Sequence, residues 1–230
     1  MRVLYCNLMV CELLCLVEVL SCYIEEMYEM NKHKKNSIQI KDLISVGVYT
    51  ALYFIMVAIS ALIVVFIIPG YSYVFIPVIS SLLTGTIFML MVAKVPRFGA
   101  ITIMGSIMGI FFFIMGRFPG ALVICILIAL TSDAFAFLFK YKSKIGLLLS
   151  FIIFSFSTIG PVIPLFIFPN IYVEELVSVG KDASYIASAF ADISQNTFYI
   201  LIIGILIAAV VGGLFGQRMM KKHFEKAGIV

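Results

Sequence analysis

Charged side chains are scarce in this chain of 230 residues, where they make up 12% of the total while 63% of the residues are hydrophobic. This composition excludes an ordinary soluble domain, in which about a quarter of the residues carry charge. A bilayer core of about 30 Å needs roughly 20 apolar residues per helix. We therefore expect an all-α, polytopic membrane protein, a bundle of six transmembrane helices. The six apolar stretches are residues 43–68, 72–93, 98–116, 119–139, 145–168 and 196–216.

The chain also lacks the groups that membrane enzymes use. Its two histidines, His33 and His223, both lie in polar tails, and no H-E-x-x-H, G-x-S-x-G or Walker A sequence occurs. General-base and metal chemistry within the membrane are therefore not expected, and any ATP hydrolysis that drives transport must come from another chain. We expect no enzymatic activity, no cofactor and no metal site.

Lys and Arg occur in every second gap between the apolar stretches. From residue 30 onward, thirteen of them lie before the first stretch and after the second, fourth and sixth, whereas the remaining gaps hold only Arg117 and Lys181. Because basic loops stay in the cytoplasm, this pattern predicts a multi-pass protein of the cell membrane with both termini inside. The net charge of +4 then reflects topology, and no nucleic acid is expected as a partner.

The first 29 residues differ from the rest of the chain. They contain four of the five cysteines, at spacings of five, four and seven residues that match no zinc pattern, and two glutamates interrupt their apolar run. We expect residues 1–29 to be an upstream extension or a disordered segment, with translation starting at Met30. Residues 30–42 and 218–230 are then basic cytoplasmic tails around a membrane domain of residues 43–217.

Small residues at four-residue spacing mark close helix contacts, because apolar side chains gain nothing by leaving lipid for a helix interface. The ladders in the third and sixth stretches are expected to pack inside the bundle; they are Gly105 and Gly109, and Gly204, Ala208, Gly212 and Gly216. Gly47 and Ala51 differ because they follow directly on the basic tail. This small-residue notch could receive a helix of another protein.

The opposite, external side is expected to carry a lid and a pocket. Pro77, Pro161 and Pro164 interrupt two stretches near their outer ends, which indicates either a cavity or ordinary proline kinks. Residues 170–195 are too long for a turn and predict a lid loop with a short helix over 181–192. The polar residues that could line a pocket beneath the lid are Tyr71, Tyr73, Arg117, Asn170, Tyr172, Gln195, Asn196 and Tyr199.

Two kinds of residue in this set have alternative interpretations. Tyrosines at a membrane surface also serve as interfacial belt residues. Arg117 breaks the charge rule, so it could bind an anionic substrate group or reach lipid headgroups.

Asp133 is the one ionisable side chain well inside an apolar stretch, and an acid at that depth indicates function. It could couple transport to protons or sodium. Alternatively, Thr131, Ser132 and Lys140 could satisfy it locally, as a structural acid or one coupled to a partner protein. The second interpretation is favoured, because no basic residue lies within the stretches to pair with it.

The combination of these features resembles a known family. The basic tail and notch, the sequence K-V-P-R-F-G-A at 94–100, G-R-F-P-G at 116–120, Asp133 and the proline-broken fifth stretch are similar to S components of energy-coupling-factor (ECF) transporters, in the Trep_Strep group. The notch departs from the Ala-xxx-Ala usual in that wider family, since it begins with Gly47. The resemblance covers about residues 32–222.

The resemblance implies a mechanism. An S component binds a vitamin or other micronutrient from outside and delivers it through a transmembrane coupling protein and two ATPase subunits. On this chain Gly47 and Ala51 would contact the coupling protein, Tyr71 and Tyr73 would belong to a first gate, and residues 170–196 would form a second. The alternatives are a self-sufficient proton-coupled carrier that uses Asp133, and a membrane scaffold without a pocket.

Overall fold

The computed structural model describes residues 38–67, 72–115, 120–163 and 195–224, together with residues 166, 173, 177 and 180. These residues belong to the unit Ile38–Val230, and every regular element among them is helical. The elements are α2 (Ile40–Ile67), α3 (Ser72–Lys94), α4 (Ala100–Ile114), α5 (Gly120–Leu138), α6 (Lys144–Ser155) with the 3₁₀ turn η1 (Phe156–Ile159), and α10 (Gln195–Met219) with the π-helical turn η2 (Met220–Phe224).

Each of the six predicted stretches overlaps one of these helices, so the all-α prediction is confirmed for the residues described. Among the residues described, four helical segments are long and apolar enough to cross a membrane: Ile40–Ile67, Phe75–Lys94, Gly120–Leu138 and Asn196–Lys222. The segments Ala100–Ile114 and Lys144–Ile159 are apolar but shorter. Pro77 lies inside α3, which continues through it, whereas Pro161 follows the 3₁₀ turn that ends the α6 segment.

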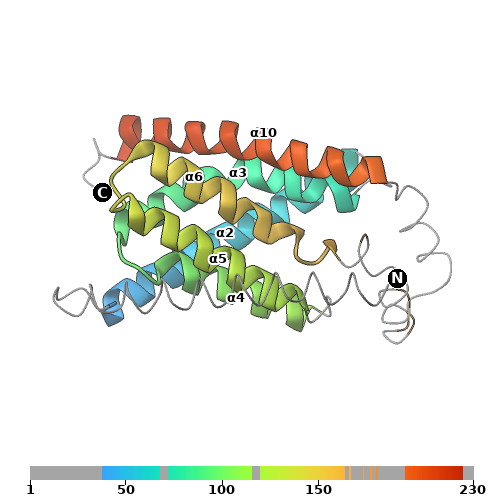
Figure 1. Cartoon of the computed structure of the whole chain (residues 1–230), viewed down its shortest axis with the longest axis horizontal. Coiled ribbons are helices and arrows are strands. Elements are labelled where there is room, and N and C mark those ends of the chain that lie inside the picture. Colours follow the sequence, from blue (N-terminus) through green and yellow to red (C-terminus); the bar gives the residue numbers. More distant parts are fainter. Residues whose placement is uncertain are drawn as a thin grey trace, which may run out of the picture. The chain divides into compact units, whose positions relative to one another are not determined.

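Within this unit the helices pack side by side (Figure 1). Helix α10 packs on α3 and α6, while α4 packs on α5 and α2. Aromatic rings fill the centre: the Phe88 ring lies 5.2 Å from those of Phe151 and Phe154, and Tyr53 meets Phe154 edge to face at 5.7 Å. All four side chains are completely buried. The aromatic centre of the core is therefore built from α2, α3 and α6, and residues of α4, α5 and α10 complete the core.

Glycines set the closest helix contacts. A β-carbon on Gly212 of α10 would lie 2.5 Å from the carbonyl oxygen of Leu82, and one on Gly216 would lie 2.6 Å from that of Gly85 on α3. On α4, a β-carbon at Gly109 would lie 3.1 Å from the carbonyl oxygen of Leu122 on α5. The prediction that the ladders of the third and sixth stretches pack inside the bundle is confirmed.

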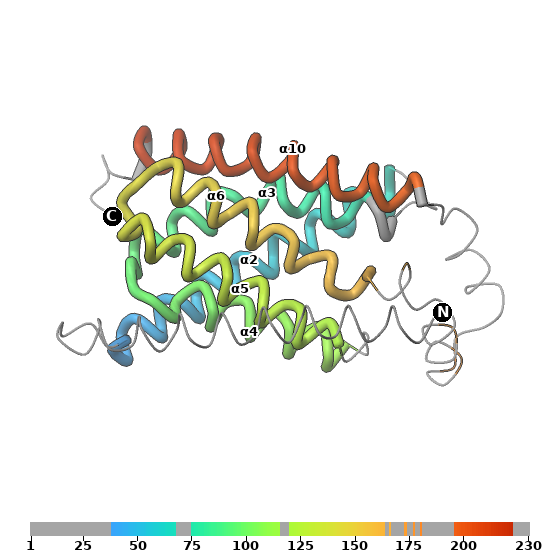
Figure 2. Tube along the Cα trace, viewed as in Figure 1, coloured from blue at the N-terminus to red at the C-terminus, as the bar shows by residue number. Residues whose placement is uncertain are grey.

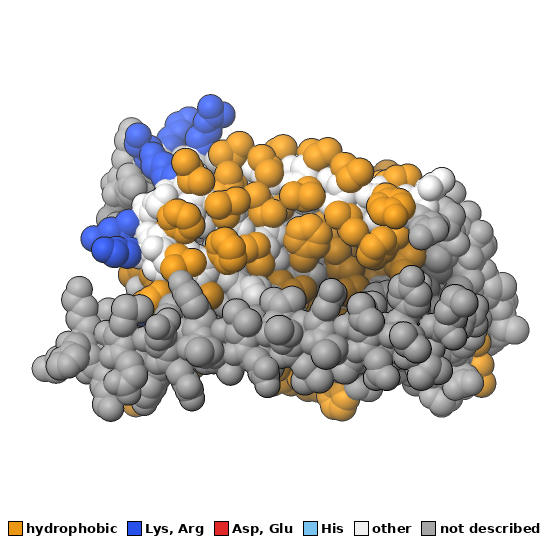
Figure 3. All heavy atoms as spheres, in the orientation of Figure 1, with side chains coloured by type: hydrophobic (Ala, Val, Ile, Leu, Met, Phe, Trp, Pro, Cys, Tyr) orange, Lys and Arg blue, Asp and Glu red, His pale blue; other side chains and the backbone are white. Residues whose placement is uncertain are grey.

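Basic side chains collect at one end of the bundle (Figure 3). Figure 2 shows that this end contains the start of α2, the α3–α4 and α5–α6 connections and the end of α10. It carries every Lys and Arg in the described part of the chain: Lys41, Lys94, Arg97, Lys140, Lys142, Lys144, Arg218, Lys221 and Lys222. We call it the basic end. The rest of the coloured surface in Figure 3 is largely apolar, as a helix surface that faces lipid must be.

Candidate functional site

The Asp133 carboxylate is the centre of a polar cluster at the basic end. Asp133 is completely buried in the last third of α5. Its Oδ2 atom accepts hydrogen bonds from the backbone N–H of Gly99 at 2.8 Å, the backbone N–H of Thr102 at 3.1 Å and the Thr102 hydroxyl at 2.9 Å. Its Oδ1 atom accepts from the Tyr141 hydroxyl at 2.7 Å. All four groups donate, so the cluster fits an ionised carboxylate.

This carboxylate supplies the N-terminal cap that α4 cannot supply itself. The N-cap residue of α4 is Gly99, which has no side chain to accept a hydrogen bond from the exposed amides of the first turn. Asp133 accepts from the amides of Gly99 and Thr102, the N-cap and third positions of the helix. A negative charge at this end is also favoured by the helix dipole.

The position of Gly99 requires glycine. Its backbone has φ of 99°, in the left-handed region, and a β-carbon there would lie 2.8 Å from the Cδ1 atom of Ile38. The turn directs the backbone N–H groups of Gly99 and Thr102 toward Asp133 on α5. Gly99 is part of the K-V-P-R-F-G-A sequence between α3 and α4.

Tyr141 reaches Asp133 from an unusual turn after α5. The backbone N–H of Tyr141 donates to the carbonyl of Ala136 and that of Lys140 to Phe137, the pattern of a Schellman helix end. Lys140 and Tyr141 both have left-handed backbones, with φ of 53° and 55°. Such a conformation costs about 1–2 kcal/mol in a residue other than glycine. The hydrogen bond from Tyr141 to Asp133 offsets part of this cost.

The environment of the Tyr141 hydroxyl favours its neutral form. Burial, the negative charge of Asp133 and the hydrogen bond to it raise the pKa of Tyr141 above its ordinary value. Tyr141 therefore remains a donor to Asp133 at any physiological pH.

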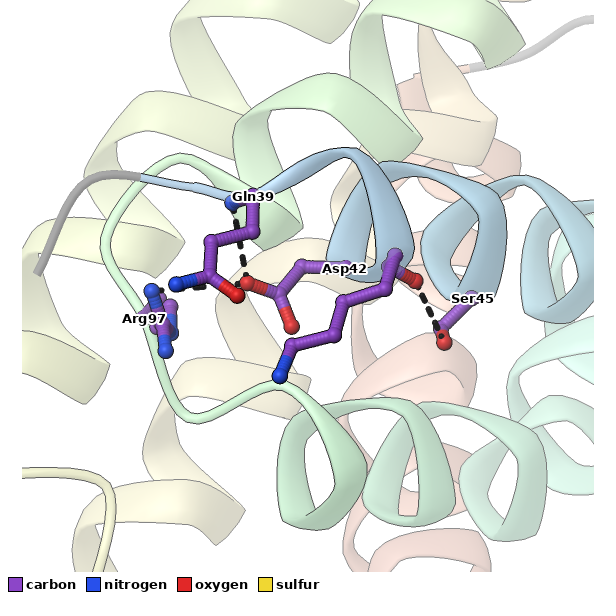
Figure 4. A network of polar contacts seen from close by, with 5 residues as sticks. Gln39, Asp42, Ser45 and Arg97 are labelled. Atoms are coloured by element: carbon purple, nitrogen blue, oxygen red, sulfur yellow. Dashed lines mark hydrogen bonds and ion pairs between the residues drawn. The ribbon is translucent and has the colours of Figure 1, made fainter.

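A second polar contact joins the α3–α4 connection to α2 (Figure 4). The Arg97 guanidinium lies 3.4 Å from the Asp42 carboxylate. The same carboxylate accepts a hydrogen bond from the backbone N–H of Gln39 at 3.0 Å and so caps the start of α2. Residues 97–99 are thus held by α2 on one side and by α5 on the other.

The partners of Asp133 differ from those expected. Thr131 donates its hydroxyl to the carbonyl of Ile128, Ser132 donates to Ser150 on α6, and Lys140 is exposed. The expectation that these three residues satisfy Asp133 was wrong. A Thr or Ser in a helix bonds readily to a carbonyl of the preceding turn. The donors to Asp133 are instead Thr102, Gly99 and Tyr141, which lie 31, 34 and 8 residues away along the chain.

The notch of Gly47 and Ala51 is open. Both residues are exposed, and a β-carbon on Gly47 would have no atom within 4 Å. Large apolar side chains surround the notch: Leu43 is 50% exposed, Ile44 64% and Val48 55%. No helix in the described part of the chain covers this face of α2.

The structure describes only four of the eight residues of the predicted external pocket. Tyr73 lies at the start of α3, and Gln195, Asn196 and Tyr199 lie in the first turns of α10, where the side chains of Asn196 and Tyr199 are exposed. The other predicted pocket residues lie outside the described part, as does the predicted lid helix; these residues are Tyr71, Arg117, Asn170 and Tyr172.

Two buried hydroxyl groups in the interior make no hydrogen bond. They belong to Tyr53 and Ser157, and they are the two such side-chain groups among the residues described. Thr84 lies beside Tyr53, but its own hydroxyl donates to the carbonyl of Ser80 at 2.8 Å. Cys125 donates to the Ser157 carbonyl at 3.3 Å, so this thiol is a buried structural group. The described residues include no cluster of metal-binding side chains.

Comparison with known proteins identifies the family. The model for the hypothetical bacterial integral membrane protein family Trep_Strep matches residues 40–226. The chain belongs to this family. Together with the four long apolar helices, membership makes it a multi-pass membrane protein, and it confirms the Trep_Strep part of the resemblance. The matched region of this Trep_Strep protein begins where α2 begins. No curated protein and no solved structure matches the chain.

Proposed function

We propose that this Trep_Strep protein is the substrate-binding S component of an ECF-type importer. It captures a vitamin or other small micronutrient from outside the cell. A transmembrane coupling protein and two ATPase subunits then drive release of the substrate inside. In this proposal α4 and the α6–η1 segment also cross the membrane, which makes six spans with both termini in the cytoplasm of a bacterial cell.

The observation that carries the proposal is the difference between the small-residue ladders. The glycines of α4 and α10 are in contact with neighbouring helices, whereas Gly47 and Ala51 face outward with room for a partner. In lipid, close approach of two backbones is what drives helix association, and small residues permit it. The notch also lies about two turns from the basic end, the side on which cytoplasmic ATPases would act.

The charge distribution supports the same assignment of sides. The described basic residues lie at one end, and positively charged loops remain in the cytoplasm. The first turns of α3 and α10 then lie on the outer side, near the predicted lid of residues 170–195. Tyr73, Asn196 and Tyr199 are the described members of the proposed substrate pocket, and Arg117 is proposed to contact an anionic group of the substrate.

A proton-coupled carrier is less consistent with the contacts of Asp133. Two of the four hydrogen bonds to this carboxylate come from the backbone N–H groups of Gly99 and Thr102, which donate and cannot accept a proton. A residue that exchanges protons along a pathway needs a partner that accepts. The cluster instead suits a carboxylate with a constant charge.

The test is recovery of the ATPases with a tagged chain from detergent-solubilised native membranes. Gly47→Leu and Ala51→Leu should each abolish recovery, because a leucine fills the notch. Ala58→Leu is the matched control, since Ala58 is an exposed alanine on the same helix nearer its other end. Undiminished recovery of ATPases with both notch variants, or none with the unmodified chain, would refute the proposal.

A further inference from the structure

Helix α2 packs on α3 and α4, but few of its residues are buried. Of its 28 residues only Val46, Thr50, Tyr53, Ser60 and Val64 are buried. Two of these are polar and donate to carbonyls of α2 itself, namely Thr50 to Val46 and Ser60 to Met56, so they make no bond to another helix. Only one face of α2 is therefore packed, and contacts at the end of the helix add to that interface.

The contact at the basic end of α2 is the ion pair of Asp42 and Arg97 (Figure 4). It lies one to two turns before Gly47, the first residue of the notch. Both side chains of the pair are mostly buried, with 13% of Asp42 and 22% of Arg97 exposed. A mostly buried ion pair is screened less by water than a surface pair, so its geometry has a larger effect on the position of α2.

Arg97 in turn lies in a connection whose shape depends on Asp133. Two residues after Arg97, the Gly99 amide donates to Asp133, and the Ala100 amide donates to the Arg97 carbonyl at 3.2 Å. The missing side chain of Gly99 also leaves room for Ile38, just before α2, whose Cδ1 atom would lie 2.8 Å from a β-carbon at Gly99. Loss of the bond from Gly99 to Asp133 would free the connection that presents Arg97 to Asp42.

We propose that Asp133 is a positioning residue for the docking helix. As an ionised carboxylate it holds the α3–α4 connection, and through the pair of Arg97 and Asp42 it fixes the basic half of α2, including the notch at Gly47. The part that concerns docking rests on the proposed function. The part that concerns the position of α2 does not.

The first experiment needs no partner protein. Hydrogen–deuterium exchange of the purified chain in detergent is measured for residues 40–50 in the unmodified chain and in Asp133→Asn, Thr102→Val and Arg97→Gln. Each variant removes one of the contacts that link Asp133, the α3–α4 connection and Asp42. Exchange over residues 40–50 should therefore rise by about tenfold, while exchange in the centre of α10 is unchanged. Arg97→Lys and Thr102→Ser keep the charge and the hydroxyl, and they should exchange at nearly the unmodified rate.

The matched control is Thr131→Val. It removes a hydroxyl on α5 next to Asp133 whose bond stays within its own helix, so exchange in α2 should be unchanged. Arg97→Gln and Thr102→Val leave Asp133 in place, and they keep the test informative if Asp133→Asn does not fold. Unchanged exchange over residues 40–50 in both of these variants would overturn the proposal, as would equal increases in α2 and in α10.

The second experiment separates this proposal from the proposed function. Arg97→Gln should reduce recovery of the ATPases from native membranes, and Arg97→Lys should restore it. If exchange in α2 rises but neither Arg97→Gln nor Gly47→Leu affects recovery, Asp133 positions α2 and the S-component assignment is wrong. If Gly47→Leu abolishes recovery but exchange in α2 is unaffected by Arg97→Gln, the S-component assignment holds and the positioning role is wrong.

Discussion

Helices α2 and α10 are both long and apolar, and both carry small residues at four-residue spacing, yet they use them differently. On α10, Gly212 and Gly216 lie against the backbone of α3. On α2, a β-carbon at Gly47 would meet no atom of the described residues within 4 Å, and apolar side chains around it are exposed. Small-residue spacing alone therefore does not distinguish internal packing from a surface that awaits a partner. The two cases are distinguished only by whether a neighbouring helix covers the small residues.

The largest effect is expected from Gly212→Leu. The new side chain would collide with the carbonyl oxygens of Leu82 and Ser81, which lie 2.5 and 2.6 Å from the β-carbon position. Backbone atoms cannot move aside as a flexible side chain can, so overpacking should exceed the usual 1–3 kcal/mol or so and prevent folding. Size-exclusion chromatography of detergent extracts measures this. A monodisperse, stable variant would show that α3 and α10 are not in such close contact.

A smaller loss is expected from Ser150→Ala. The Ser150 hydroxyl donates to the Ser132 carbonyl at 2.9 Å and lies 2.9 Å from the Ser132 hydroxyl, so it joins α5 to α6 inside the bundle. Its removal should destabilise the protein by about 1 kcal/mol. Thermal denaturation in detergent measures the change. Ser45→Ala is the control, because that exposed hydroxyl bonds only within α2, and an equal loss there would contradict the prediction.

For Gly47→Leu the stability of the isolated chain should change by less than about 0.5 kcal/mol, because the side chain enters open space. This variant is the direct counterpart of Gly212→Leu, with the same substitution on the other helix. The same thermal measurement applies. A melting temperature lowered as far as that of an interior variant would mean that the notch is filled within the chain.

The smallest effect concerns alkaline pH. The raised pKa of Tyr141 means that the folded state holds this proton more tightly than the unfolded state, whose value is near 10.0. The stabilisation is fully present below pH 10 and is lost as pH rises through the folded-state pKa. Tyr141→Phe should therefore remove part of the alkaline loss of stability, measured as melting temperature between pH 8 and pH 11. Identical pH profiles for the two proteins would contradict the role of this hydroxyl.

Much of the fold could be predicted, but the central polar cluster could not. Apolar length and the placement of Lys and Arg predicted six helices and a basic end. Asp133 was recognised as exceptional, but its donors were missed because Gly99 and Thr102 lie more than 30 residues away along the chain. The left-handed turn at Lys140 and Tyr141 contains no glycine or asparagine to indicate it. Tyr141 therefore looked like an ordinary loop residue.

The pattern of neighbouring residues is enough to predict helices, because hydrophobicity and charge over one or two turns determine how a segment sits in the bilayer. From them follow the membrane location, the helix positions and the collection of cations at one end. The tertiary structure was needed to show which glycines are covered and which donors reach Asp133. Both depend on where another helix lies, and helix packing is set by contacts between distant segments rather than by local pattern.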